Sequence, residues 1–153
     1  MNRMRKVLIA DDEIKVGQLV KRLIQWDRLG LTCIGLVTDG QTAYEKILSE
    51  SPDIVITDIR MPVLTGLEMI QKASEQGVKC HFIVVSGYKY FDYAQKALKY
   101  GVEDYLLKPI DEDKLNRQLQ KIVAEEEQRE DKQQQVDQIE KKLEDSKYLR
   151  HKE

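Results

Sequence analysis

The chain has 153 residues, of which 41% are hydrophobic and 34% are charged, and its formal net charge is −2. This length allows one domain whose hydrophobic core needs no disulfide or metal for stability. The near-neutral charge argues against a chain-wide basic surface for nucleic acid or anionic membranes. The two cysteines lack metal-binding or redox spacing, and no apolar stretch approaches the length of a membrane span. We therefore expect a cytoplasmic protein with two reduced cysteines and no membrane partner.

Five short apolar runs recur along the chain, and we interpret them as β-strands. They cover residues 7–10, 33–37, 54–56, 82–85 and 105–107. Three of them, with the sequences VLIA, IVI and FIVV, are continuously apolar rather than alternating. This pattern is typical of strands that are buried on both faces of a parallel sheet.

Segments with apolar residues at helical spacing follow each run. They lie near residues 16–24, 43–48, 67–73, 94–98 and 115–122. Thr65 and Glu68 have the spacing of a capping box at the start of the third segment. Gly30, Gly77 and Gly101 follow the first, third and fourth segments, where a left-handed residue often ends a helix. Five strand–helix units in succession predict an α/β fold: a doubly wound, five-stranded parallel sheet with right-handed crossovers.

The last 30 residues, 124–153, differ in composition from the rest, with 10 acidic and 7 basic residues and no glycine or proline. This composition favours a solvated helix that extends the segment 115–122. Polar residues interrupt any coiled-coil seam, so a weak coiled coil and a frayed end are alternatives that stay open. We divide the chain into a domain, 1–123, and a charged helical linker or tail, 124–153. The tail's sparse apolar residues at heptad-like spacing are Val136, Ile139 and Leu143.

Polar residues stand at the ends of four of the apolar runs. In chain order they are Asp11 and Asp12, Asp58, Ser86 and Lys108. The carboxyl ends of parallel strands form the crevice where such sheets bind ligands, so we expect these side chains to meet there. Carboxylates without cysteine or histidine suit a hard cation, Mg²⁺ first. An ammonium and a hydroxyl beside them predict a phosphoryl site in which an aspartate is the nucleophile. Taken alone, Asp12 also fits a helix cap and Lys108 a solvated surface residue.

A family resemblance follows from these motifs. Over about residues 5–123 the chain contains, in order, V-L-I-A-D-D-E, D-I-V-I-T-D-I-R-M-P-V-L-T-G-L-E, F-I-V-V-S-G-Y and D-Y-L-L-K-P-I. Together they resemble the response-regulator receiver domains of two-component systems. The resemblance implies a flavodoxin-like sheet with strand order 2-1-3-4-5, extended here by the C-terminal helix.

The resemblance also implies roles for individual residues. Asp58 is expected to accept a phosphoryl group from a sensor histidine kinase, with Lys108 and Ser86 as the other catalytic residues. Mg²⁺ is the implied cofactor, and the implied metal ligands are Asp11, Asp12, Asp58 and the backbone carbonyl of Arg60. The family's enzymatic activity is limited to self-phosphorylation and slow self-dephosphorylation, so the resemblance implies a signalling switch rather than an enzyme.

The switch itself is expected to consist of Ser86 and Tyr105, with the Lys108–Pro109 bond in the cis form. For Tyr105 the alternative is a strand aromatic without a switching role. For the whole chain the alternative is a pseudo-receiver that acts only as a protein-interaction module.

The stretch S-G-Y-K-Y-F-D-Y-A-Q-K-A-L-K-Y-G resembles receivers that precede an AraC-type DNA-binding domain. We therefore expect transcription regulation through an output domain absent from this chain, with a stand-alone receiver as the alternative. A homodimer is expected through the face of segments 94–98, 105–107 and 115–122 or through the C-terminal helix. The alternative for that face is that the clustered aromatic residues of this stretch are buried against the sheet instead of being exposed for dimerisation.

Overall fold

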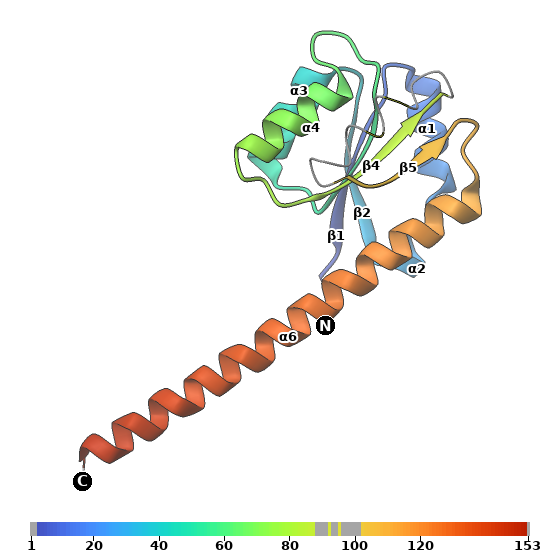
Figure 1. Cartoon of the computed structure of the whole chain (residues 1–153). Helices are drawn as coiled ribbons and strands as arrows, with labels where there is room; N and C mark the ends of the chain where they lie inside the picture. Colours follow the sequence, from blue (N-terminus) through green and yellow to red (C-terminus); the bar gives the residue numbers. More distant parts are fainter. Residues whose placement is uncertain (1–2, 88–91, 93–94, 96–101, 153) are drawn as a thin grey trace. The chain divides into compact units, whose positions relative to one another are not determined.

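A parallel sheet forms the centre of the protein in the computed structural model, which describes residues 3–87, 92, 95 and 102–152. Its five strands have the order β2-β1-β3-β4-β5, and every neighbouring pair is parallel. The predicted doubly wound α/β fold and its flavodoxin-like strand order are confirmed (Figure 1). The strands are β1 (Arg5–Ala10), β2 (Leu31–Val37), β3 (Ile54–Asp58), β4 (His81–Ser86) and β5 (Val102–Leu107).

Helices cover both faces of this sheet. α3 and α4 lie side by side on one face, and α1 packs on the other face against β1 and β2 (Figure 1). The predicted helix near residues 94–98, with Gly101 after it, lies mostly outside the described residues. The helices are α1 (Ile14–Leu23), α2 (Trp26–Leu29), α3 (Gly40–Glu50), α4 (Gly66–Glu75) and α6 (Glu112–Lys152).

The continuously apolar runs are buried because helices cover both faces. Successive side chains of a strand point to opposite faces. Leu8 therefore joins the core beneath α3 and α4, with Ala43 and Met69 among its members, while Val7 and Ile9 point the other way. All three β1 side chains are at most 1% exposed. Burial of each such side chain contributes about 1.5–3 kcal/mol to stability.

The first helix is shorter than the apolar pattern predicts. That pattern extends to residue 24 and takes Gly30 as the end of the same helix, but α1 ends at Leu23. Gly30 instead ends the separate short helix α2, at a φ of 67°. The prediction of one helix ending at Gly30 is therefore wrong.

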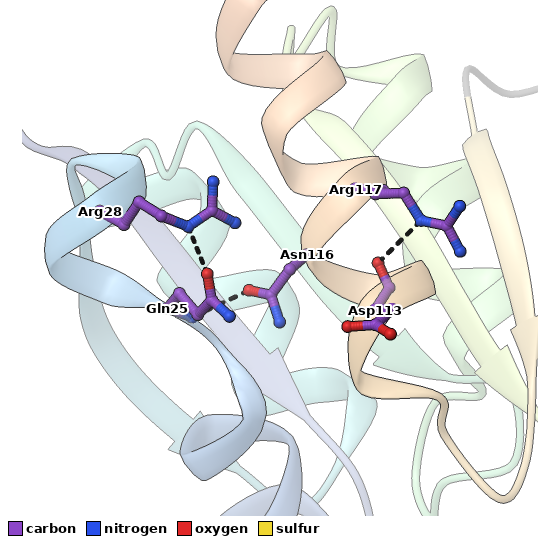
Figure 2. A pocket seen from close by; sticks show the side chains of 5 residues that line it. All are labelled: Gln25, Arg28, Asp113, Asn116 and Arg117. Carbon is purple, nitrogen blue, oxygen red and sulfur yellow. Dashed lines mark hydrogen bonds between the residues drawn. The ribbon is translucent and has the colours of Figure 1, made fainter.

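A side chain from α6 stabilises this interruption. Asn116 is 3% exposed, and its amide accepts the Gln25 N–H at 2.9 Å and donates to the Leu23 carbonyl at 2.8 Å. It also donates to the Glu112 carbonyl at 2.9 Å. Figure 2 shows Asn116 reaching from α6 toward Gln25. The backbone groups that the break leaves without helical partners are thus satisfied by a residue more than 90 positions away in the sequence.

Two predicted helix ends are confirmed. Thr65 and Glu68 form both hydrogen bonds of the capping box at the start of α4. Gly77 follows the end of that helix with a φ of 76°, a conformation that glycine adopts without strain.

The C-terminal segment is helical as predicted, since α6 continues to Lys152. The chain divides into two compact units, Met1–Leu119 and Gln120–Glu153. Within the second unit Val136, Ile139 and Leu143 are 46–59% exposed. The domain boundary at residue 123 and the coiled coil stay predictions. Among the described residues, no helix is both long and apolar enough to cross a membrane.

Candidate functional site

The sheet brings the predicted polar residues to one edge. Asp58 and Ser86 are the last residues of β3 and β4, and Asp11 and Lys108 directly follow β1 and β5. The strands are parallel, and their pairing extends to the residues at or next to these positions. Their carboxyl ends therefore deliver all four side chains to the same edge, as the strand pattern predicts.

Three carboxylates gather there. Asp11, Asp12 and Asp58 each offer an oxygen atom, and these atoms lie within 4.8 Å of one another. Asp11 and Asp58 are 3% and 6% exposed, whereas Asp12 is exposed. The Asp12 side chain does not cap α1, because the N-cap residue is Glu13 and no side-chain cap bond is present. The alternative interpretation of Asp12 as a helix cap is therefore wrong.

Lys108 lies between the two buried carboxylates. Its Nζ is 3.0 Å from Asp58 Oδ2 and 3.3 Å from Asp11 Oδ2. Burial opposes the charge of this ammonium, but the hydrogen bond and charge of Asp58, followed by those of Asp11, outweigh it and raise the pKa of Lys108. Lys108 is thus held as a cation at the position where a phosphoryl group on Asp58 would need one.

The environment of Asp11 favours its protonated form. Burial is the largest cause and raises its pKa, and the charge of Asp58 raises it further. The Glu13 N–H at 2.9 Å and the charge of Lys108 act in the opposite direction. The result is a pKa of about 6 instead of 3.8. The positive charge of the Lys108 ammonium does not fully balance the negative charge of the three carboxylates. Three oxygen ligands in such surroundings fit a divalent cation such as Mg²⁺.

Both carboxylate oxygens of Asp58 have partners. Oδ1 accepts the backbone N–H of Ile59 at 2.7 Å, and Oδ2 accepts from Lys108. The Thr57 hydroxyl donates to the Asp58 carbonyl at 2.8 Å, which fixes the backbone at the same residue. The sequence gives no signal for the Ile59 contact, because a backbone N–H is present at almost every position.

The ends of β4 and β5 are joined beside this carboxylate. The Lys108 N–H donates to the Ser86 carbonyl at 2.9 Å. Ser86 is fully buried, and its hydroxyl donates to the Gly87 carbonyl at 3.4 Å. The Lys108–Pro109 bond is cis, as predicted. A serine hydroxyl with so long a hydrogen bond is available for a stronger acceptor.

The two remaining predicted site residues are Tyr105 and Arg60. Each is only two or three residues along the chain from a residue at this edge of the sheet. Tyr105 in β5 is partly buried and packs against the core. Arg60, two residues after Asp58, has an exposed side chain. The switching role of Tyr105 and the metal-binding role of the Arg60 carbonyl stay predictions.

A pocket of about 350 Å³ lies between α2 and the first turns of α6 (Figure 2). Its arginines bind neighbours in their own segments: Arg28 donates to Gln25 and Arg117 to the Asp113 carbonyl. Sequence reasoning did not single out these residues. Of the residues that line this pocket, Asn116 accepts the Gln25 N–H at the α1–α2 break described above.

Known proteins support the family resemblance. The protein-family model described as the response regulator receiver domain matches residues 7–120 of this chain. The chain therefore belongs to the response regulator receiver domains. Such domains are signalling switches of two-component systems, and membership implies a histidine kinase partner.

Similar proteins are transcriptional regulators. The chain is 46% identical over 122 residues to the transcriptional regulatory protein YesN of Bacillus subtilis, a match that covers 80% of this chain and 33% of YesN. It is 35% identical over 120 residues to the transcriptional regulatory protein HptR of Staphylococcus aureus, covering 78% of this chain and 47% of HptR. The chain thus spans about a third to a half of the length of these relatives.

Solved structures of similar regulators have the same fold. The receiver domain of AraT, a response regulator from Geobacillus stearothermophilus, superimposes with a TM-score of 0.79 at 36% identity, over 83% of this chain and 98% of that one. A two-component transcriptional regulator AraC from Clostridium phytofermentans gives a TM-score of 0.71 at 29% identity, over 78% and 93% of the two chains.

Proposed function

We propose that this protein is a phosphorylation-controlled switch in which Asp58 accepts a phosphoryl group from a histidine kinase. The observation that supports this most strongly is the position of Asp58. Its carboxylate lies at the end of a buried strand, contacts Lys108 and has Asp11 and Asp12 beside it. Each of these groups suits phosphoryl transfer, which depends on positioning and on charge stabilisation.

The reaction can be written from these groups. An Asp58 oxygen attacks the phosphorus atom of a phosphohistidine, the phosphorus–nitrogen bond breaks, and the kinase imidazole leaves with the electron pair of that bond. Asp11, Asp12, Asp58 and the Arg60 carbonyl would hold a Mg²⁺ ion, which when bound would supply positive charge for the transferring oxygens. Lys108 offers its ammonium to an oxygen of the product, and Ser86 offers its hydroxyl.

Phosphorylation then shifts an equilibrium between two forms of the domain. Ser86 and Tyr105 are the residues proposed to carry that change away from Asp58. The proposed output is transcription through an AraC-type DNA-binding domain, working in the cytoplasm. Its support is the naming of similar proteins as transcriptional regulators and the partial coverage of their length. Dimerisation, through the face that includes β5 or through the tail helix, is proposed as the route to that output.

Intact-mass measurement tests the chemistry. The protein is incubated with acetyl phosphate and Mg²⁺, beside an Asp58→Asn variant and a sample with a chelator. We expect one added phosphoryl group in the wild type alone, with a sizing column then reporting dimerisation. If the wild type gains no phosphoryl group and calorimetry detects no Mg²⁺ binding, the alternative of a pseudo-receiver is correct and this proposal is wrong.

A further inference from the structure

The loop between Asp58 and α4 approaches the start of α3 very closely at one residue, Gly40. A Cβ atom on Gly40 would lie 1.8 Å from the Leu64 carbonyl oxygen and 2.5 Å from its carbonyl carbon. These are backbone atoms, so no side-chain rotation could relieve the overlap. The Gly40 N–H also points to this loop and donates to the Pro62 carbonyl at 3.4 Å. Glycine is therefore required here for space.

The same loop is strained at its tip. The Leu64 N–H donates to the Pro62 carbonyl at 2.8 Å, which closes a three-residue turn around Val63. Val63 has a φ of 70°, a left-handed conformation that a β-branched residue rarely adopts. Its side chain is 82% exposed, so packing of that side chain does not hold it there. Such strain persists only where the surrounding structure imposes it.

Both ends of the loop are fixed. Near Asp58, Ile59 and Met61 are each 5% exposed. At the other end, the Gly66 N–H donates to the Ile59 carbonyl at 2.7 Å. At the tip, Leu64 packs against the core, and Gly40 of α3 contacts the backbone of the tip at Pro62 and Leu64.

The helix that carries Gly40 cannot easily retreat. Ala43 and Ile47 of α3 are at most 1% exposed and belong to the central core. The Asp39 side chain caps the same helix by accepting the Thr42 N–H at 2.7 Å. A larger residue at position 40 would therefore displace the loop rather than the helix.

From this geometry we propose that Gly40 is a positioning residue for the phosphoryl site. It lets α3 hold the loop of residues 60–64 in its strained turn, and so fixes the backbone of Arg60 next to Asp58. The inference rests on the proposed Mg²⁺ site, in which the Arg60 carbonyl is a ligand. Loss of a residue that orients a metal ligand typically weakens metal affinity by about 10- to 100-fold.

The test compares two glycine-to-alanine variants. Gly40→Ala is expected to raise the Mg²⁺ dissociation constant by about 10-fold or more in calorimetry. Phosphorylation by acetyl phosphate should slow at low Mg²⁺ and recover at saturating Mg²⁺. The matched control is Gly17→Ala, in the buried face of α1, where the three atoms nearest to a Cβ would be Leu36 side-chain atoms at 3.0–3.1 Å. That side chain can move, so Mg²⁺ affinity should stay at the wild-type value.

A double variant separates positioning from stability. In Gly40→Ala/Val63→Gly the turn can move away from the new Cβ, because glycine adopts many backbone conformations. Urea unfolding should show stability restored toward the wild type while Mg²⁺ binding stays weak. If Gly40→Ala does not fold, the Mg²⁺ affinity of this double variant tests the role of Gly40 instead.

The outcomes are distinct. Wild-type affinity in Gly40→Ala overturns the role of Gly40, as does recovery of affinity together with stability in the double variant, or failure of both variants to fold. A wild type that binds no Mg²⁺ refutes the proposed function itself.

Discussion

Replacing Asp11 by asparagine should stabilise the protein at neutral pH when no divalent cation is present. Burial and the charge of Asp58 raise the pKa of Asp11 from 3.8 to about 6. The folded state therefore holds this proton more tightly than the unfolded chain. Stability then falls as the pH rises from about 4 to about 6, and the loss persists at pH 7. Asparagine keeps the acceptor for the Glu13 N–H and removes the charge.

The expected gain follows from the size of that pKa change. A tenfold change in proton affinity corresponds to about 1.4 kcal/mol, so a pKa of about 6 sets an upper limit of about 3 kcal/mol. Loss of the contact with Lys108 and access of water to the cluster reduce this figure. We expect a gain of about 1–2 kcal/mol, which corresponds to a shift of roughly 0.5–1 M in the urea midpoint.

The assay is urea unfolding at pH 5 and pH 7, with a chelator and then with Mg²⁺. The variant should exceed the wild type at pH 7 with chelator, by a margin that shrinks at pH 5, and should gain less from Mg²⁺. Asp12→Asn is the matched control, because it removes the same charge from an exposed position and should change stability less. An Asp11→Asn protein that is less stable than the wild type at pH 7 in chelator would refute this reasoning.

Two further predictions concern the fold. Asn116→Leu should cost about 2–4 kcal/mol in urea unfolding, because it leaves the Leu23 carbonyl and the Gln25 N–H without partners; a cost below about 1 kcal/mol would contradict the role given to this amide. For Asp53, burial would raise the pKa, but the hydrogen bonds from the Arg3 side chain and the Lys6 N–H, together with the charges of Arg3 and Arg5, outweigh burial and lower it. That carboxylate therefore contributes stability above pH 4 that is lost as the pH falls through its folded pKa. Asp53→Asn should flatten the fall in stability between pH 5 and pH 3, and an unchanged pH profile would exclude this contribution.

Much of the fold could be predicted from local sequence. The continuous apolar runs indicated strands buried on both faces, and Thr65 with Glu68 indicated the start of a helix, because each of these patterns acts within a few residues. Strand order did not follow from periodicity and came from the family resemblance. The break after Leu23 could not be predicted, since the residue that stabilises it, Asn116, lies on α6.

The residues that form the site could be predicted from the sequence, but the contacts among them could not. Strand ends carrying Asp11, Asp58 and Lys108 were sufficient to expect a cluster. The position of Lys108 between two carboxylates depends on distances that only the folded chain defines. The left-handed Val63 was not predictable either, because a β-branched residue locally disfavours that conformation and tertiary contacts impose it.

The central claim, that a phosphoryl group is carried by Asp58, is tested most directly by chemical trapping. Borohydride reduces an acyl phosphate to an alcohol, so an aspartyl phosphate becomes homoserine at the modified position. The protein is phosphorylated with acetyl phosphate and Mg²⁺, reduced, digested and sequenced by mass spectrometry. Homoserine at position 58 alone is the predicted result. Phosphorylated protein that yields homoserine at Asp11 or Asp12, or at no position, would contradict the account.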